Sequence, residues 1–128
     1  FVKIAELRVG GLVNSSELAS TLGVSKTSID NYLYVSEKSF HIHLVKPFFK
    51  NMRKELTKMP KVYFSDLGLR NFFANNFKSF EIREDRGEFL ENAVFRQLLE
   101  IYDQDSIRFW RTTQKNEVDF VVDDSRAY

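Results

Sequence analysis

The strongest constraint on the fold is a pair of short helices separated by a glycine turn. Asn14 or Ser15 can begin the first helix and Ser25 the second, because short polar side chains accept hydrogen bonds from the free N–H groups of a helix start. Leu22-Gly23-Val24-Ser25 lies between the two helices, and Gly23 supplies the tight turn. This spacing predicts a helix-turn-helix.

The apolar residues of this segment predict how its two helices pack. Ala19 is small where the helices would cross, and Val24 is expected to fill the junction. Ile29, Tyr32 and Leu33 are expected on the inner face of the second helix, since they recur at helical spacing, and Ser36 is a further candidate for this face. The outward face would then carry a set of mainly polar residues, namely Lys26, Thr27, Asp30, Asn31 and Tyr34.

Two predicted strands follow, and they complete a winged helix-turn-helix over residues 1–64. Phe40–Leu44 alternates with a period of two, and Lys61–Phe64 has the composition of a strand. The segment between them is basic, and either a helix or a loop with local turns would suit its sequence. The basic residues in or beside the wing are Lys46, Lys50, Arg53, Lys54, Lys58 and Lys61. Lysine and arginine side chains there can contact phosphates, and such contacts depend on salt concentration. The nucleic-acid-binding candidates are Lys26, Thr27, Asn31, Lys50, Arg53, Lys54 and Lys58.

Charge supports a division into two units but leaves the role of the first unit open. Residues 1–64 carry 10 basic and 5 acidic side chains, whereas residues 65–128 carry 9 and 13. A basic unit suits DNA, yet winged helices also serve as protein-binding modules and spacers. Asp30 on the outward face is unfavourable beside phosphates, although it can accept a hydrogen bond from cytosine.

The second half, residues 65–128, is predicted to contain two helices and a β-hairpin. Asp66 can cap the first of these helices. Residues 87–102 form a strongly periodic helix, in which Leu90, Val94, Leu98 and Ile101 mark the expected inner face. Residues 107–111 and 117–122 would form the hairpin.

Two carboxylates in this half lie at positions where an unpaired charge would be unfavourable. Asp119 lies inside an apolar strand and Glu91 lies inside an apolar helix, and a carboxylate placed there needs a partner. One interpretation is a cation from the neighbouring strand, Arg108 or Arg111. The other is a divalent-metal site, for which Glu91 and Asp119 are the candidate ligands and the candidate catalytic residues of a nuclease-like unit.

Several stretches together resemble a known family, the predicted prokaryotic AAA-superfamily ATPases that carry a C-terminal domain of unknown function with a restriction-endonuclease-like fold. The resemblance spans nearly the whole chain in the family's order. The matching stretches are Leu12-Val13-Asn14-Ser15-Ser16-Glu17-Leu18-Ala19, Leu22-Gly23-Val24-Ser25, Pro60-Lys61-Val62-Tyr63-Phe64-Ser65-Asp66-Leu67-Gly68-Leu69-Arg70-Asn71, Gly87-Glu88-Phe89-Leu90-Glu91-Asn92-Ala93-Val94-Phe95, Phe109-Trp110-Arg111-Thr112 and Glu117-Val118-Asp119-Phe120.

The resemblance implies an α+β chain, a winged helix-turn-helix followed by an incomplete restriction-endonuclease-like unit. It also implies an upstream ATPase module that binds ATP and Mg²⁺. This chain has no GxxxxGK[ST] phosphate loop, so no ATPase activity and no cofactor are expected for it alone. The family's nuclease-like carboxylates map onto Glu91 and Asp119. Its third-strand acid and lysine have no counterpart, because no lysine follows Asp119.

Three functions remain open from the sequence. The first is a nucleic-acid-binding and regulatory module of a larger ATPase, without chemistry of its own. The second is the front part of a Mg²⁺-dependent nuclease, and the third is an assembly module that joins ATPase subunits. An open edge of the short sheet would also permit a homo-oligomer.

Composition favours a cytoplasmic protein that does not contact a membrane. The chain has no cysteine, which fits a reducing compartment. It shows neither an apolar run long enough to cross a bilayer nor a signal-peptide pattern.

Overall fold

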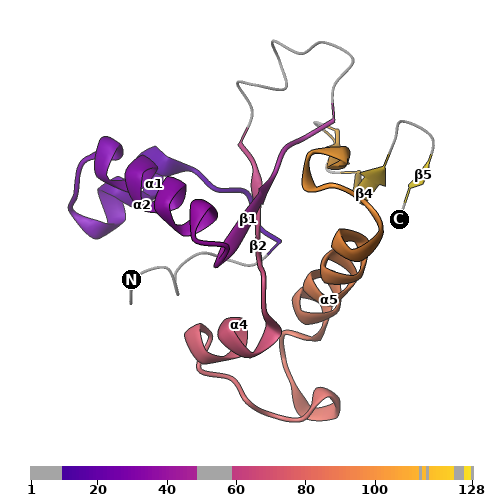
Figure 1. Ribbon diagram of the computed structural model, residues 1–128. Coiled ribbons are helices and arrows are strands. Elements are labelled where there is room, and N and C mark those ends of the chain that lie inside the picture. The colour runs from indigo at the N-terminus through magenta and orange to yellow at the C-terminus, as the bar shows by residue number, and fades with distance from the viewer. Residues whose placement is uncertain (1–9, 49–58, 113, 115, 123–125, 128) are drawn as a thin grey trace.

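The fold is mixed α+β, as expected from the sequence. The computed structural model describes residues 10–48, 59–112, 114, 116–122 and 126–127 (Figure 1). These residues form four α-helices and two small antiparallel sheets. The helices are α1 (Ser15–Leu22), α2 (Lys26–Lys38), α4 (Leu67–Phe73) and α5 (Arg86–Ile101), with 3₁₀ turns η2 (Phe80–Ile82) and η3 (Gln104–Ser106). The strands are β1 (Ile42–Val45), β2 (Lys61–Phe64), β3 (Ile107–Arg111), β4 (Glu117–Val122) and β5 (Arg126–Ala127).

Local capping explains where α1 and α2 begin and end. The side chain of Asn14 accepts from the backbone N–H groups of Ser16 and Glu17, at 3.1 and 3.2 Å. Ser25 caps α2 by accepting from the N–H of Ser28 at 3.1 Å. Gly23 ends α1 in the left-handed region with φ of 67°, which confirms the turn expected there.

The inner face of α2 is narrower than expected. Ile29, Leu33 and Ser36 are buried, and they follow one another at intervals of four and three residues. Tyr32 is 59% exposed and Val24 is also exposed, so both predicted packing roles are wrong.

The strands form two antiparallel sheets. In the first, Ile42 of β1 lies opposite Phe64 of β2. In the second, β4 pairs with both β3 and β5, so the predicted two-stranded hairpin is part of a three-stranded sheet. The first strand begins two residues later than predicted, because Phe40 has a positive φ of 60° and lies outside it.

Backbone hydrogen bonds join the two sheets just after β1. The N–H of Phe48 donates to the carbonyl of Phe109 at 2.6 Å, and the N–H of Phe109 donates to the carbonyl of Lys46 at 3.2 Å. Pro47 thereby forms a parallel bridge with Phe109. The hairpin of the first half is thus attached directly to β3 of the second half.

Helix α5 packs through a face that shares only Leu98 with the predicted one. Its buried residues are Asn92, Phe95 and Leu98, whereas Ile101 is 72% exposed and Leu90 is also exposed. The apolar stripe used for the prediction therefore faces mostly outward. A polar residue, Asn92, belongs to the true inner face because the backbone of β2 supplies partners for its amide group.

The hydrophobic core crosses the predicted boundary between residues 64 and 65. Tyr63 of β2 stacks on Phe95 of α5 with ring centroids 4.7 Å apart, and it lies 5.3 Å from the ring of Phe120 in β4. Figure 1 shows β1 and β2 between the α1–α2 pair and α5. The two sequence units therefore share one core.

An arginine–aspartate cluster holds the connector between α4 and α5. Asp85 lies 2.7 Å from a guanidinium nitrogen of Arg70 and 2.9 Å from one of Arg83, and both arginines are buried. Hydrogen bonds from Arg83, and then from Arg70, lower the pKa of Asp85 to about 2. The Arg83 guanidinium also lies over the ring of Phe89, 4.3 Å from its centroid.

Within the described part of the chain, no helix has the length and apolar character needed to cross a membrane.

Candidate carboxylate site

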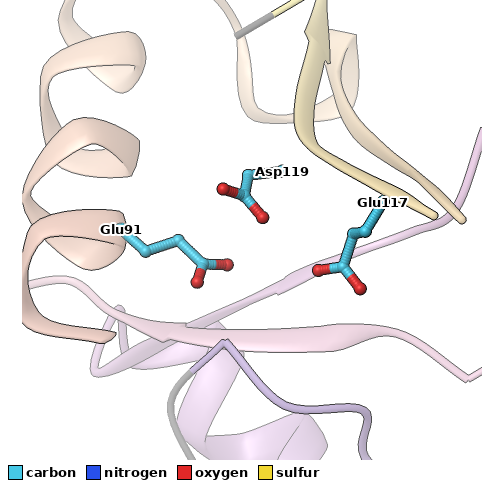
Figure 2. Close-up of side chains that lie close together, drawn as sticks. All are labelled: Glu91, Glu117 and Asp119. Atoms are coloured by element: carbon cyan, nitrogen blue, oxygen red, sulfur yellow. The ribbon is translucent and has the colours of Figure 1, made fainter. Parts of the chain in front are cut away.

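Three carboxylates converge where α5 faces the second sheet. Glu91 comes from α5, and Glu117 and Asp119 come from β4. Each offers an oxygen within 4.8 Å of the others. Figure 2 shows the three carboxylates pointing toward a common region between helix and sheet.

Regular secondary structure accounts for the positions of these side chains. Alternate residues of a strand share a face, so Glu117 and Asp119 project to the same side of β4. Phe120 and Val122 project to the opposite side and are buried, which fixes the register. On the helix, Asn92 binds the backbone of β2 and thereby sets the position of the neighbouring Glu91.

A lysine from β2 lies among the carboxylates. The ammonium of Lys61 is 3.3 Å from Oε1 of Glu91 and 3.7 Å from Oδ1 of Asp119, and it forms an ion pair with Glu117. The Lys61 side chain is only 1% exposed. Its ammonium also lies 5.2 Å from the centroid of the Phe109 ring. A cation so far removed from water needs charged partners, and the cluster supplies them.

Tyr63 completes the buried side of the cluster. Its hydroxyl donates to Oε1 of Glu91 at 2.5 Å. Burial, reinforced by the charge of Glu91, raises the pKa of Tyr63 far above its ordinary value, so the phenol keeps its proton and remains a donor. Burial also raises the pKa of Glu91, against the opposing effects of Tyr63 and Lys61.

The donor set fits a divalent cation such as Mg²⁺. Hard divalent cations prefer oxygen ligands, and three carboxylates provide them. With all three ionised, the acids and the Lys61 ammonium together carry a net charge of −2, which one divalent cation would balance. Access is provided by a cleft of about 620 Å³, lined by Gly10, Gly11, Leu12, Gly87, Glu88, Glu91, Arg111 and Glu117.

The structure brings together Glu91 and Asp119, the two acids singled out in the sequence. Their shared cation is Lys61, whereas Arg111 lies 3.7 Å from Glu117 and Arg108 donates to the carbonyl of Asp105. The expectation that an arginine of the neighbouring strand would pair with Asp119 is therefore corrected.

Sequence reasoning missed Glu117, and it placed Lys61 in the basic cluster of the wing, whereas the Lys61 side chain is buried. Glu117 could have been found, because it lies two residues before Asp119 and so shares its strand face. For Lys61 the only local sign was a lysine inside a short apolar strand. Its partner Glu117 is 56 residues away in the sequence, so no local pattern connects them.

The predicted nucleic-acid-binding residues lie elsewhere. Lys26, Thr27 and Asn31 are exposed on the first two turns of α2. The other four candidates fall outside the described residues, namely Lys50, Arg53, Lys54 and Lys58.

Two mycobacterial proteins are similar to this chain along most of its length. They are the uncharacterized protein Mb2031c of Mycobacterium bovis and the uncharacterized protein Rv2008c of Mycobacterium tuberculosis. Each is 29% identical over 116 residues, which cover 89% of this chain and 26% of the relative. The chain thus spans about a quarter of the length of these relatives. No solved structure matches it.

Two family models match successive parts of the chain. Residues 86–128 match a domain of unknown function, DUF4143, and this region contains Glu91, Glu117 and Asp119. Residues 1–79 match a second domain of unknown function, DUF8612, and this region contains the helix pair, β1, β2 and Lys61. Since the latter match covers more than half of the sequence, the chain belongs to the DUF8612 family.

Proposed function

We propose that this chain is a nucleic-acid-binding module of the winged helix-turn-helix type. The observation that carries the proposal is the exposed first half of α2. Its buried residues Ile29 and Leu33 hold the helix against the core, which leaves Lys26, Thr27 and Asn31 facing solvent on neighbouring turns. Side chains at the start of such a helix can reach base edges in a major groove.

The surrounding structure supports this assignment. Helix α1 packs against α2, with the Gly23 turn between them, and the antiparallel β1–β2 pair follows α2 directly. Leu12 adds an antiparallel bridge to Lys61, which extends the pair toward a third strand. A helix pair followed by a small antiparallel sheet is the arrangement in which a winged helix presents its second helix to DNA. Asparagine can pair with adenine, and lysine can contact guanine or phosphate.

A binding titration tests the proposal. Duplex binding by the whole chain, measured by fluorescence anisotropy at several salt concentrations, should weaken steeply as salt rises. Lys26→Ala should weaken binding and reduce the salt dependence by about one unit of slope, as expected for one lost phosphate contact. Lys78→Ala, at an exposed position of the connector, is the matched control. Absence of binding at low salt would contradict the proposal and favour an assembly role.

We also propose that the module serves a larger ATPase, in which it contributes binding and regulation rather than ATP hydrolysis. The resemblance to AAA-superfamily ATPases supports this, as does the absence of a phosphate loop from the 128 residues. The test is to measure ATP hydrolysis by the full-length protein with and without duplex DNA. A rate of ATP hydrolysis that does not change when DNA is added, or a response to DNA that is unchanged by Lys26→Ala, would contradict a regulatory role.

The carboxylate cluster favours a second candidate function, metal-dependent cleavage of nucleic acid by a restriction-endonuclease-like unit. The order of a helix Glu followed by a strand Asp agrees with that fold, and Glu117 adds a third oxygen ligand. A bound Mg²⁺ would supply an activated water and neutralise charge on the phosphate. Glu91, Glu117 and Asp119 would hold the ion, and the cleft beside them would receive the nucleic-acid strand to be cut.

For the 128 residues alone we expect no cleavage. The sequence after Asp119 contains no acid-x-Lys element, and Lys61 already engages the three carboxylates. Incubation of plasmid DNA with the chain and Mg²⁺ or Mn²⁺ tests this expectation. Cleavage that disappears in Asp119→Asn would replace the binding-only proposal with the nuclease.

A further inference from the structure

Lys61 reaches the carboxylate cluster from a different part of the chain. It lies on β2, 30 residues before Glu91 and 56 residues before Glu117. Its side chain is buried, whereas the carboxylates are progressively more open, from 18% exposure at Glu91 to 53% at Asp119. The cluster is therefore built around a fixed internal cation.

The ammonium compensates repulsion among the three acids. Their oxygens lie within 4.8 Å of one another, a distance at which like charges repel strongly away from bulk water. Lys61 contacts the two less exposed acids, Glu91 and Glu117, and lies 3.7 Å from the more exposed Asp119. Removal of one partner from a buried charge group leaves the others uncompensated. Without Lys61, the acids would separate or become protonated.

The same oxygens would have to bind a divalent cation. Oε1 of Glu91 already accepts hydrogen bonds from both Lys61 and Tyr63. A divalent ion held by these carboxylates would lie within a few ångströms of the ammonium and be repelled by it. The buried Lys61 side chain has little room to withdraw, because the ring of Phe109 lies against its ammonium.

We propose that Lys61 is a positioning residue of the carboxylate cluster, which holds the three acids together without a metal and keeps the affinity for divalent cations low. The proposal rests on the second candidate function only in treating the cluster as a cation site. It makes β2, a strand of the nucleic-acid-binding unit, part of the control of that site. The physical cause is the fixed positive charge at the centre of the acids.

The test compares the wild-type chain with Lys61→Met, which keeps the length and apolar character of the stem but removes the charge. In EDTA, Lys61→Met should lower the midpoint of thermal unfolding by about 5 °C or more. Mn²⁺ should then raise the midpoint more in Lys61→Met than in the wild type. A titration followed by the electron paramagnetic resonance signal of Mn²⁺ should show that the variant binds Mn²⁺ at least about tenfold more tightly than the wild type. Lys78→Met is the control and should change neither quantity.

A second variant separates charge from packing. Lys61→Met combined with Glu117→Gln restores the wild-type net charge of the cluster, so it should recover part of the lost stability and respond less to Mn²⁺ than Lys61→Met alone. If Lys61→Met is unfolded in EDTA, recovery of the fold by Mn²⁺ or by Glu117→Gln supports the proposal, and failure of both contradicts it.

The remaining outcomes are equally decisive. Equal or weaker Mn²⁺ binding by Lys61→Met would overturn the proposal, and so would the absence of Mn²⁺ binding by either protein. Neither result would contradict the proposal that α2 binds DNA. Conversely, tighter Mn²⁺ binding by the variant would support the proposal whether or not any form of the chain cleaves DNA, because no cleavage is expected of the 128 residues alone.

Discussion

Asn92 pairs with both backbone polar groups of Phe64. Its side-chain oxygen accepts from the Phe64 N–H, and its side-chain nitrogen donates to the Phe64 carbonyl, both at 2.9 Å. The amide group thus takes the place of a neighbouring strand at this point of β2. Because Glu91 is the preceding residue on α5, this pairing also holds the helix at the distance from β2 at which Glu91 meets Lys61 and Tyr63.

Replacement of Asn92 should therefore be costly. Asn92→Ala leaves the buried N–H and carbonyl of Phe64 without partners, and each such group costs about 1–3 kcal/mol. We expect the free energy of unfolding to fall by roughly 2–5 kcal/mol, measured by urea denaturation. Gln97→Ala, on the exposed side of the same helix, should stay within about 0.5 kcal/mol of the wild type. Similar values for the two variants would contradict the role of Asn92.

Two of the three glycines that line the cleft, Gly10 and Gly87, should respond oppositely to substitution by alanine. Gly10 has φ of +71°, and an added Cβ would lie 2.9 Å from a carboxylate oxygen of Glu91. Gly10→Ala should thus destabilise the chain by about 1–2 kcal/mol, the cost of a left-handed alanine. Gly87 lies in α5 and has no atom within 4 Å of the added Cβ, so Gly87→Ala should stabilise by roughly 0.5–1 kcal/mol. Thermal unfolding of both variants measures the two effects. A change of stability in the same direction for both variants would contradict this prediction.

Asp85 should make stability depend on acidity. Its pKa in the folded chain is about 2, below the ordinary value of 3.8, so its contribution is complete above about pH 4 and is lost as the pH falls through 2. Asp85→Asn removes the charge that compensates two buried arginines. At neutral pH this substitution should lower the free energy of unfolding by an amount approaching about 3–5 kcal/mol, the cost of breaking a buried ion pair.

The measurement is urea unfolding of wild type and Asp85→Asn at pH values from neutral to acidic. The difference in unfolding free energy should narrow between about pH 4 and pH 2, since the wild-type carboxyl becomes protonated there. A difference that is constant across this range would show that the charge of Asp85 contributes nothing to the fold.

The orientation of α2 can be tested with two substitutions on its opposite sides. Leu33 is buried against the core, so Leu33→Ala should cost about 2–5 kcal/mol. Thr27 is exposed, and Thr27→Ala should change stability by no more than about 0.5 kcal/mol. Denaturant unfolding compares the two, and a reversed order would mean that Thr27, rather than Leu33, faces the core.

Local chemistry made the beginnings of several helices predictable. Asn14 and Ser25 accept hydrogen bonds from N–H groups two or three residues later, and Asp66 does the same for Leu69 at 2.8 Å. Such contacts lie within one turn of the chain, so the sequence contains both partners side by side. The same holds for Gly23, whose left-handed conformation ends α1.

Features that depend on distant partners were harder to predict. The exposed Leu90 and Ile101 have the periodicity of a core face, yet α5 turns Asn92 and Phe95 inward because β2 offers both backbone hydrogen bonds and the ring of Tyr63. Glu91 and Asp119 could be singled out, since a carboxylate among apolar neighbours needs a partner. That the partner is Lys61 follows only from the tertiary packing of β2.

The core shared across the two matched regions has a consequence for the family's evolution. Tyr63 lies within residues 1–79, whereas Phe95 and Phe120 lie within residues 86–128, and the three rings pack together. A recombination event that exchanged one region for unrelated sequence would expose these rings and leave Lys61 without its acids. The two regions should therefore be inherited as a pair, and substitutions at Tyr63 and Phe95 should be correlated among relatives.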